Sequence, residues 1–382
     1  MIDVAWARSE YPLLAEKTYL NSGSYCPLAK RVKLAFEAYM DERLAVGANW
    51  DQWVLKSDEV RSLVARLLRV EDDEIAVTAS VTAGLNAIAS ALDFSGDRNR
   101  IVVTDFEFPT NAQVWHAQAP RGAEVVHAKP GPDGYISAEA FENLIDDRTR
   151  LVAITHVCFR NGARLDIPSI VAMAHRRGAL VLLDSYQAVG SIDIDARALG
   201  VDFAVGGMLK YLLGTAGIGY LYVRKALIPS LVPTVSGWWA QADIQAMDIT
   251  RNNPHPTARR FEAGTPPVVN CYAAAAGLQL ILEVGTDAIE AHIRALTRYC
   301  LDRLADIGWP SVTPARDDRR AAMIAIPSRA SGRLMETLLA RDIVTSHRDM
   351  NLRASFHYFN DDSDVDRLIA ALAELKLDFG PA

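Results

Sequence analysis

Cysteine is scarce in this chain, and its thiols are not grouped. The 382 residues include four cysteines, Cys26, Cys158, Cys271 and Cys300. Their wide spacing matches neither the paired ligands of a zinc site nor a dense disulfide framework, so buried free thiols are expected. The eight histidines form no close pair at helical spacing. The sequence therefore gives no support for a metal site.

Long apolar runs and long basic runs are missing as well. No hydrophobic stretch approaches the ~20 residues of a membrane span, and the first residues, MIDVAWARSEYPLL, lack a basic start followed by an apolar stretch. The formal net charge is −7 and no long block of Lys and Arg occurs. These absences argue against nucleic acid or an anionic membrane as the main partner, while small anionic ligands remain possible at local sites. We expect a cytoplasmic protein.

The chain does contain a regular alternation of helix and strand patterns. Half of its residues are hydrophobic, and its length exceeds that of one usual domain, so a large and a small domain are expected. Helical spacing covers residues 29–46, 55–69, 85–92, 166–177, 268–284 and 286–306, and strands are expected at 74–78, 101–104, 123–127, 151–155, 180–183, 202–205 and 218–223. This order predicts an α/β fold with a mainly parallel sheet covered on both faces, followed by a smaller α+β domain.

The segment from 180 to 224 carries the residues with the clearest chemistry. Asp184 ends the apolar run ALVLL, and Lys210 precedes a glycine-rich turn. Residues at the carboxyl ends of parallel strands line the binding crevice of open α/β sheets. A desolvated, partly deprotonated lysine can form a Schiff base with the aldehyde of pyridoxal phosphate, and a carboxylate such as Asp184 can keep the ring nitrogen of that cofactor protonated.

Each of these two residues also has an ordinary structural interpretation. Most loop lysines are solvated, and an Asp after a strand is often a helix N-cap. A nicotinamide dehydrogenase is disfavoured, because no strand is followed by G-x-G-x-x-G opening a helix. The sequence GTAGIGY after Lys210 leads instead into the apolar strand IGYLYV.

The order of residues around Lys210 resembles that of class V pyridoxal-phosphate enzymes. The matching positions are Asp184, Gln187, Gly190, Asp195, Asp202, Gly206, Gly207 and Lys210. The resemblance to the class V aminotransferase superfamily, which contains kynureninases, cysteine desulfurases and isopenicillin N epimerase, extends from YLNSGSYCPL (19–28) to LRASFHYFNDDSDVDRL (352–368). It implies fold type I, with a seven-stranded, mainly parallel sheet in a large domain at 15–255 and a small domain formed by 1–14 with 256–382. It also implies pyridoxal phosphate as the cofactor, contacted by Gln187 among others.

A phosphate site is expected at the start of a helix in TASVTAGLNAIAS, residues 78–90. Free N–H groups and the helix dipole favour an anion there, and Ser80 and Thr82 can add hydroxyl donors. Ser and Thr are also common helix caps. By the resemblance, Thr82 and the backbone of Ala83 occupy the places of the family's phosphate cup.

The cofactor ring and the substrate are expected to contact two further segments. FEFPTNAQVW (106–115) is similar to a kynureninase segment whose Phe stacks on the cofactor, which implies stacking by Phe108 and a pocket position for Asn111. HVCFRNGARLDI (156–167) also resembles kynureninase, so Arg160 and Asn161 are candidates for contact with the substrate or a cofactor oxygen. Arg160 is equally compatible with a surface position. Tyr25 is a further candidate for the substrate pocket.

Two more assignments come from the resemblance. Arg353 in LRASFHYFN matches the family's carboxylate-binding arginine, and a planar guanidinium suits a carboxylate. Gly264 and Thr265 in RRFEAGTPPVV match a loop that reaches the cofactor phosphate of the neighbouring subunit, which implies a homodimer with a shared active site. A tight turn would explain Gly264 without any ligand.

Departures from each relative narrow the expected reaction. No cysteine follows Cys300, so transfer of sulfur to a protein thiol is disfavoured. Leu209 precedes the lysine where kynureninase has Tyr, and Gln187 and Gln241 stand where kynureninase has His, so kynurenine cleavage is in doubt. The leading hypothesis is proton removal from Cα by Lys210 with β-elimination, such as C–S cleavage, on an amino acid or an amino acid conjugate. Transamination or epimerisation is the alternative reaction. A third hypothesis is a catalytically silent binding protein.

Overall fold

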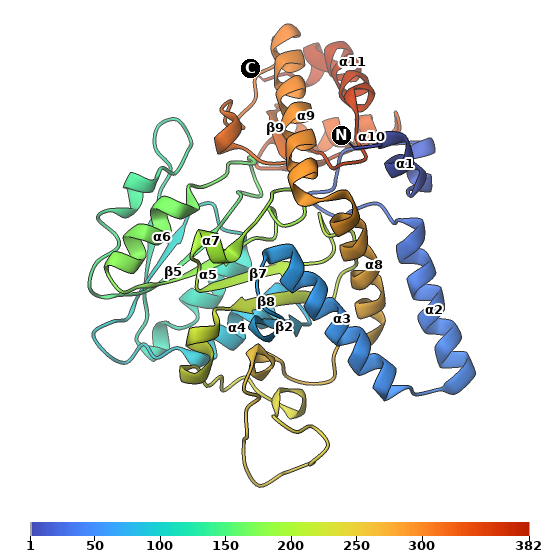
Figure 1. Cartoon of the computed structure of the whole chain (residues 1–382). Coiled ribbons are helices and arrows are strands. Elements are labelled where there is room, and N and C mark those ends of the chain that lie inside the picture. The colour runs from blue at the N-terminus through green and yellow to red at the C-terminus, as the bar shows by residue number, and fades with distance from the viewer. Residues whose placement is uncertain (1, 382) are drawn as a thin grey trace.

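A seven-stranded sheet forms the centre of the computed structural model, which describes residues 2–381 (Figure 1). Its strands are β2 (Ile75–Thr78), β3 (Arg100–Thr104), β4 (Glu124–Ala128), β5 (Thr149–Thr155), β6 (Leu180–Asp184), β7 (Phe203–Gly207) and β8 (Gly219–Val223). They are ordered β2-β8-β7-β6-β5-β3-β4, and within this sheet only β8 runs antiparallel to its neighbours. The predicted α/β fold with a mainly parallel sheet is confirmed.

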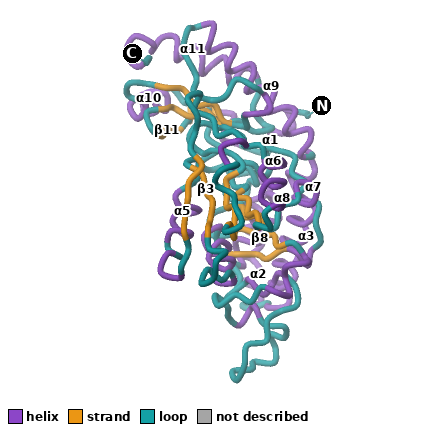
Figure 2. Tube along the Cα trace, turned by 90° about the vertical axis from the view of Figure 1, so that its left-hand side faces the viewer, coloured by secondary structure: helices purple, strands orange, loops and turns teal. Residues whose placement is uncertain are grey.

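Side-chain alternation explains why both faces of this sheet are buried. Successive residues of a strand point to opposite faces. In β3, Ile101 and Val103 belong to one hydrophobic cluster, and Val102 belongs to the other. Helices α4 (Val81–Ala91) and α5 (Pro109–His116) cover the first face, and α3 (Trp50–Leu68), α6 (Ile167–Arg176), α7 (Ala196–Leu199) and α8 (Val268–Val284) contribute to the second cluster. Figure 2 shows α5 on one side of the strands and α6 and α8 on the other.

A second, smaller body follows the sheet. Its three-stranded antiparallel sheet has the order β11-β12-β9, with β9 (Met323–Pro327), β11 (Ser346–Arg348) and β12 (Asn351–Ser355). Helices α9 (Thr286–Asp306), α10 (Ser331–Leu339) and α11 (Asp362–Phe379) enclose a separate core with this sheet. Near the N-terminus, α1 (Val4–Ser9) precedes β1 (Thr18–Tyr19), which pairs with β10 (Ile343–Val344). The smaller α+β part is therefore present.

The packing of helix α8 helps to locate the boundary between the two domains. It packs against α3 and α2 (Lys30–Val46), which belong to the large body, whereas α9 packs against α11. The change occurs at Gly285, whose φ of +89° lies in the left-handed region that favours glycine. The sequence placed the division near residue 256; we propose that it lies at Gly285, with residues 18–20 also joining the small domain.

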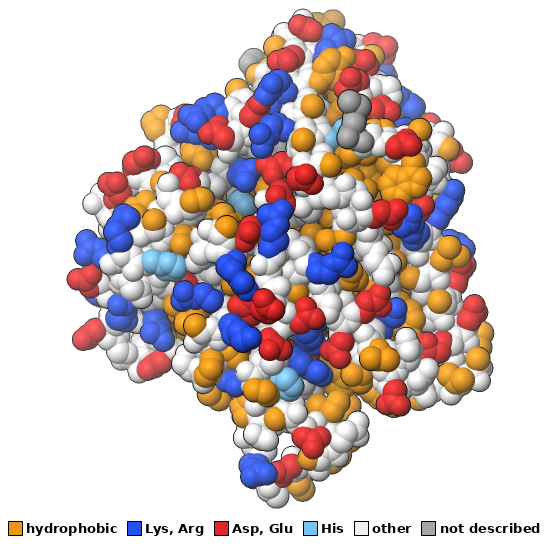
Figure 3. Space-filling view, in the orientation of Figure 1, with side chains coloured by type: hydrophobic (Ala, Val, Ile, Leu, Met, Phe, Trp, Pro, Cys, Tyr) orange, Lys and Arg blue, Asp and Glu red, His pale blue; other side chains and the backbone are white. Residues whose placement is uncertain are grey.

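The surface charges and the apolar character of the helices do not point to a particular function. The face shown in Figure 3 carries acidic and basic side chains interspersed, without a large area of one sign. Among residues 2–381, no single helix has the length and apolar composition of a membrane span; α8 and α9 meet that test only jointly, by length and composition, and are bent by 77°. The cytoplasmic location stays a prediction.

Candidate active site

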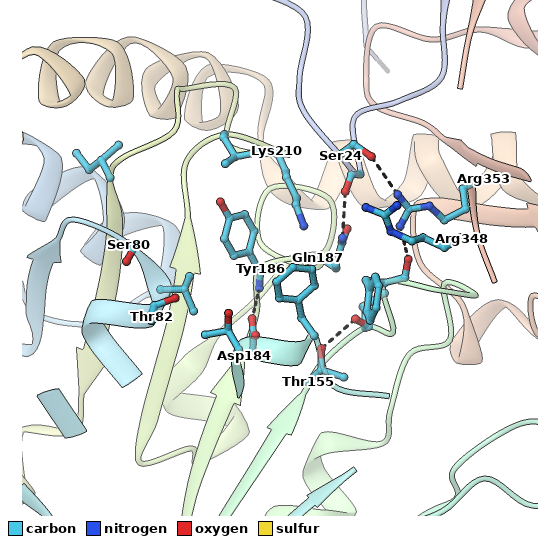
Figure 4. A pocket seen from close by; sticks show the side chains of 18 of the residues that line it. Ser24, Ser80, Thr82, Thr155, Asp184, Tyr186, Gln187, Lys210, Arg348 and Arg353 are labelled. Carbon is cyan, nitrogen blue, oxygen red and sulfur yellow. Dashed lines mark hydrogen bonds between the residues drawn. The ribbon is translucent and has the colours of Figure 1, made fainter. Parts of the chain in front are cut away.

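A cavity of about 390 Å³ lies at the carboxyl edge of the large sheet (Figure 4). Thr155 and Asp184 end the adjacent parallel strands β5 and β6, and both line this cavity. This is the edge at which open α/β sheets bind ligands. Seven of the predicted site residues line it together: Ser80, Thr82, Phe108, Asp184, Gln187, Lys210 and Arg353.

The loop that carries Lys210 is closed by backbone hydrogen bonds. It joins β7 to β8; the N–H of Gly214 donates to the carbonyl of Met208 at 2.8 Å, and the N–H of Met208 donates to the carbonyl of Ile218 at 3.3 Å. These bonds fix the backbone on both sides of the lysine. The amine consequently projects into the cavity (Figure 4).

Burial changes the titration of Lys210. It lowers the pKa of this amine to about 8; the charge on Asp184 raises the pKa, and the cations of Arg353 and Arg348 lower it further. Part of the amine is therefore neutral near pH 7. The neutral form is the one that attacks an aldehyde or accepts a proton.

Two aromatic rings flank the amine. The Nζ atom of Lys210 lies 4.4 Å from the centroid of the Tyr186 ring and 5.7 Å from the centroid of the Phe108 ring. Gly207 makes room for Tyr186, because a Cβ atom at position 207 would lie 2.3 Å from that ring. The flat space beside the amine is thus bounded by aromatic carbon, as a planar cofactor ring requires.

Asp184 presents a carboxylate oxygen without a protein donor. Its Oδ1 atom accepts a hydrogen bond from the backbone N–H of Tyr186 at 3.0 Å, whereas no donor to Oδ2 occurs in the described part of the chain. Burial raises the pKa of Asp184, and the Tyr186 N–H and the charge on Lys210 oppose that effect. A buried carboxylate in this position is suited to accept a charge-assisted hydrogen bond.

The start of α4 forms a second polar wall. Ser80 is the N-cap residue, and its Oγ atom accepts from the N–H of Ala83 at 3.1 Å. The Ala83 N–H is therefore used by the cap, while Thr82 is exposed to the cavity. Gly219 allows β8 to approach, since a Cβ atom there would lie 3.3 Å from the nitrogen of Val81. The first N–H groups of a helix suit a phosphate.

Arg353 is a buried cation with neutral partners. Its Nη2 atom donates to the hydroxyls of Ser24 and Ser346, each at 3.0 Å, and Nη1 donates to the carbonyl of Phe159 at 2.5 Å. Within residues 2–381 it forms no ion pair with an acidic side chain. Burial lowers the pKa of Arg353 to about 10, and the nearby Arg348 acts in the same direction. An unpaired buried guanidinium favours an anionic ligand.

The predicted direction of Asn111 is wrong. The side chain of Asn111, a residue of helix α5, is fully buried and does not line the cavity. Its Nδ2 atom donates to Glu107 at 2.6 Å, and its Oδ1 atom accepts from the indole of Trp115 at 2.9 Å. Asn111 and Trp115 are four residues apart on one helix face, which directs the amide away from the ligand space.

Arg160 and Asn161 also lie outside the cavity lining. The Oδ1 atom of Asn161 accepts from the N–H of Ala163 at 3.0 Å and so supports a tight turn. Arg160 is partly exposed, donates to the carbonyl of Asp105, and has its Nε atom 3.7 Å from a carboxylate oxygen of Asp349. Neither side chain points at the ligand space of its own chain, because the turn directs them elsewhere.

The remaining predicted residues differ in how close they lie to the cavity. Gln187 lines the cavity and donates to the carbonyl of Gly23 at 3.0 Å. Tyr25 is half-exposed and its hydroxyl lies 3.1 Å from that of Thr215. Gly264 and Thr265 are exposed in the loop before α8, outside the lining of the chain's own cavity. Their predicted role across a dimer stays a prediction.

Sequence reasoning missed a buried acid behind the cavity, Glu107. It accepts from the hydroxyl of Thr104 at 2.5 Å, from Asn111, and from the N–H of Thr155 at 2.9 Å. Burial raises the pKa of Glu107 to about 8, against the effect of these three donors. Thr104 and Asn111 are close to Glu107 in the sequence, but Thr155 is 48 residues away. The burial of Glu107 behind strand β5 therefore could not be read from its neighbours in the sequence alone.

Among the residues of the cavity wall that were also missed are Ser24, Tyr186 and Arg348. Tyr186 stands two positions after Asp184. Arg348 stands two positions after Ser346, and the two side chains lie on the same face of their strand. A period of two along a strand end could have suggested Arg348. Ser24 enters the site only through the folding back of the N-terminal segment.

Comparison with known proteins now identifies the family. The family model Aminotransferase class-V matches residues 45–368. The chain belongs to this family. It is 32% identical over 366 residues to the uncharacterized aminotransferase YcbU of Bacillus subtilis (strain 168), covering 96% of each protein. It is 30% identical over 338 residues to a cysteine desulfurase of Salmonella newport (strain SL254), covering 83% of this chain and 82% of that one.

Solved structures agree on the fold. The complex of the cystine C–S lyase C-DES with its reaction product cysteine persulfide has a TM-score of 0.88 and 24% sequence identity, and the match covers 97% of this chain and 100% of that one. As a member of the class-V family, the protein is a pyridoxal-phosphate-dependent enzyme of fold type I. The predicted family, fold type and cofactor are confirmed.

The residues of the cavity fit this cofactor. The open oxygen of Asp184 suits a protonated ring nitrogen, and Lys210 supplies the amine that the aldehyde needs. The start of α4, with the hydroxyls of Ser80 and Thr82, suits the phosphate. Figure 4 shows Ser80 and Thr82 on the opposite side of Lys210 from Arg353, so the polar start of α4 and the guanidinium form separate walls of the cavity.

Proposed function

We propose that this class-V family enzyme is a lyase. It eliminates a β-substituent, through cleavage of a C–S bond, from an amino acid or an amino acid conjugate. The observation that carries the proposal is that Lys210 and Arg353 line one cavity, whereas none of the four cysteines does.

The chain's own residues have distinct roles in this reaction. Bound pyridoxal phosphate supplies an electron sink for the charge that develops at the substrate Cα. Arg353 binds the α-carboxylate through its planar guanidinium. The Cα–H bond is thereby held near Lys210, whose neutral amine accepts the α-proton at Nζ. Asp184, with its Oδ2 atom free of a protein donor among the described residues, would hold the ring nitrogen of the cofactor in its protonated form.

The bond changes balance without an added oxidant or reductant. The electron pair left by the α-proton forms a double bond between Cα and Cβ as the Cβ–S bond breaks. The sulfur leaves with the bonding electrons as a thiolate. The remaining aminoacrylate takes up one water molecule, and thiol, pyruvate and ammonia are the products from a cysteine conjugate.

The cysteines support release of sulfur rather than its transfer to the protein. Burial raises the pKa of Cys26, Cys271 and Cys300 to about 12 each, and it also raises the pKa of Cys158. All four thiols are buried. A thiol that ionises so weakly is a poor nucleophile. Sulfur accordingly leaves as a small-molecule thiolate.

The relatives support two reaction classes. Cysteine desulfurase and the cystine C–S lyase C-DES both have names that describe C–S chemistry, which favours the lyase. The Bacillus subtilis relative has a name that describes an aminotransferase, and transamination is therefore the second candidate. Both would use Lys210 for proton transfer and Arg353 for carboxylate binding.

The decisive experiment follows the products of purified holoenzyme. S-substituted cysteines are added, and pyruvate, ammonia and free thiol are measured together with the absorbance spectrum. The lyase predicts equal amounts of the three products, and a Lys210→Ala variant that binds cofactor without turnover. An amino donor that converts the cofactor to pyridoxamine phosphate without ammonia would establish transamination instead. No product from any cysteine conjugate would refute the lyase.

We also propose a homodimer in which Gly264 and Thr265 complete the partner's site. Phe108, on the cavity wall, and Tyr25, near its mouth, are 46% and 42% exposed in the single chain. Helix α2 exposes Leu34, Met40 and Leu44 as well. Exposed apolar side chains of this kind support an interface between subunits.

A further inference from the structure

The β11–β12 hairpin places two arginines on one face. Ser346 is the cross-strand partner of Arg353, and Arg348 is the partner of Asn351. Cross-strand partners and residues two apart in a strand share a face. These four side chains therefore point the same way, while the alternate residue Leu352 is fully buried in the small domain's core. Arg348 is the diagonal neighbour of Arg353.

Both arginines line the active-site cavity, but at different depths. Arg353 is 3% exposed, whereas Arg348 is exposed at the rim. The hydrogen bond from Arg348 Nη1 goes to the carbonyl of His347 at 3.3 Å, which is a neutral partner. Among the described side chains, Arg348 forms no ion pair with an acid. Its charge is close enough to lower the pKa of both Lys210 and Arg353.

The charges of the cavity leave Arg348 without a ligand in the proposed reaction. Lys210, Arg348 and Arg353 are the cationic side chains of the lining, and Asp184 is its one acidic side chain. The α-carboxylate of an amino acid satisfies Arg353. The cofactor phosphate is accounted for at the α4 start, across the cavity (Figure 4). One cation on the substrate side then faces the cavity with no negative partner.

We propose that Arg348 binds a second acidic group of the substrate, a carboxylate carried on its β-substituent. The substrate is then an amino acid with an anionic tail, such as an S-carboxyalkyl cysteine. This inference rests on the proposed function, because it assigns the α-carboxylate to Arg353. A planar guanidinium binds a carboxylate with two parallel hydrogen bonds, so Arg348 would select the tail by both charge and shape.

The first test measures binding without chemistry. Glutarate has two carboxylates and butyrate has one, and neither has an amino group, so both bind the holoenzyme without reacting. Calorimetric titration should give roughly tenfold tighter binding of glutarate, the factor expected from one added hydrogen bond to a charged group. Arg348→Gln should remove that advantage and leave the affinity for butyrate within about twofold.

Arg160→Gln is the matched control. Arg160 is a nearby cation that does not line the cavity, so its removal should leave the preference for glutarate intact. Equal affinity of the wild-type holoenzyme for both acids would overturn the proposal. An equal loss of affinity for both acids in Arg348→Gln would also overturn it, because Arg348 would then bind the α-carboxylate. A loss of the preference for glutarate in the Arg160 variant alone would overturn it as well.

A kinetic comparison separates this inference from the proposed function. S-(carboxymethyl)cysteine and S-ethylcysteine differ in the acidic tail. Arg348→Gln should raise KM for the first about tenfold more than KM for the second, because any effect of the lost charge on Lys210 and Arg353 is shared by both conjugates. Turnover of both conjugates with equal efficiency by the wild-type enzyme would refute the acidic tail and keep the lyase. Absence of product from both, with the glutarate preference present, would refute the lyase alone.

Discussion

Burial of Lys210 sets the pH range in which its amine is neutral. Its pKa of about 8 means that the neutral amine increases as pH rises through 8 and is nearly complete at pH 9 and above. In the apoenzyme, labelling of Lys210 by an amine-reactive reagent should therefore reach half of its maximal rate near pH 8. Peptide mass spectrometry over pH 6 to 11 measures this. A midpoint near ~10.4, the value of a solvated lysine, would contradict it.

Two variants should move that midpoint in opposite directions. Asp184→Asn removes the negative charge that raises the pKa of Lys210, so its midpoint should fall below that of the wild type. Arg353→Met removes a cation that lowers the pKa, so its midpoint should rise. A parallel shift of both variants in one direction would mean that burial of the amine, rather than these charges, had changed.

Tyr186 and Gly207 form a complementary pair beside the amine. Tyr186→Ala removes one of the two rings that flank Lys210, and cofactor release should be roughly tenfold faster, the effect of about 1.4 kcal/mol of aromatic contact. Stopped-flow absorbance during cofactor removal measures the rate. Phe108→Ala is the matched control for the other ring and should give a loss of similar size.

The Gly207→Ala variant checks the same contact from the other side. The added methyl group would meet the Tyr186 ring at 2.3 Å, so this variant should lower the Tm of the apoenzyme. Combining it with Tyr186→Ala should restore most of the loss, because the ring that causes the clash is gone. Additive losses in the double variant would show that Gly207 is required by the strand rather than by Tyr186.

The sequence was informative where a side chain follows from local order. Asp184 and Lys210 lie at the cavity because a strand end and the next loop of an α/β sheet meet at one edge. Asn111 was misplaced because its direction depends on hydrogen bonds with Glu107, just before helix α5, and with Trp115 on that helix. Ser24 reaches the cavity through a contact with the distant Arg353, which a single sequence does not encode locally.

Among the elements, the β11–β12 hairpin places Arg348 and Arg353 in the wall of the cavity. Its turn residues Asp349 and Met350 have φ values of +49° and +62°, as a two-residue turn with positive φ at both positions requires. Met350 is exposed, and its Cβ atom makes this conformation sterically unfavourable. Met350→Gly should raise the free energy of unfolding by about 0.5–1 kcal/mol, the lost strain less the added chain entropy.

The urea midpoint of the apoenzyme measures this effect, with an unchanged slope. Met350→Ala is the control, because it shortens the side chain and keeps the Cβ atom, so its midpoint should stay near that of the wild type. A loss of stability in Met350→Gly, of the size seen for a glycine placed in a strand, would contradict the prediction, because it would mean that the positive φ of Met350 causes no strain.

Elements with a regular apolar period were predictable to within a few residues. Apart from the edge strand β4, the strands of the large sheet are almost wholly buried and appear as short apolar runs between turns. Helix α5 was missed, since it is short and begins at Pro109 within a segment that was interpreted for its chemistry. Helix α3 begins at Trp50, earlier than predicted, because its first turn is anchored by aromatic contacts of Trp50 with Trp53 and Trp238.

At the scale of the whole molecule, a single chain leaves its cavity partly open. The loop with Gly264 and Thr265 is fastened to the large sheet through Glu262, which accepts from Arg61 at 2.8 Å and from the N–H of Val77 at 2.8 Å. A loop so anchored, yet exposed at its tip, has a fixed position from which it can reach a neighbouring subunit. The proposed dimer would use this tip to close the partner's phosphate site.

Subunit mixing tests that arrangement. Lys210→Ala lacks the reactive amine, and Thr265→Asp places a negative charge where the loop would meet the partner's phosphate, so each variant alone should have little activity. In a mixed dimer, one site carries both lesions and the other carries neither. After unfolding and joint refolding of equal amounts, about a quarter of all sites should be intact, and the activity should recover in that proportion. No recovery, with mixed dimers demonstrated by native mass spectrometry, would place Thr265 in its own subunit's site and refute the shared active site.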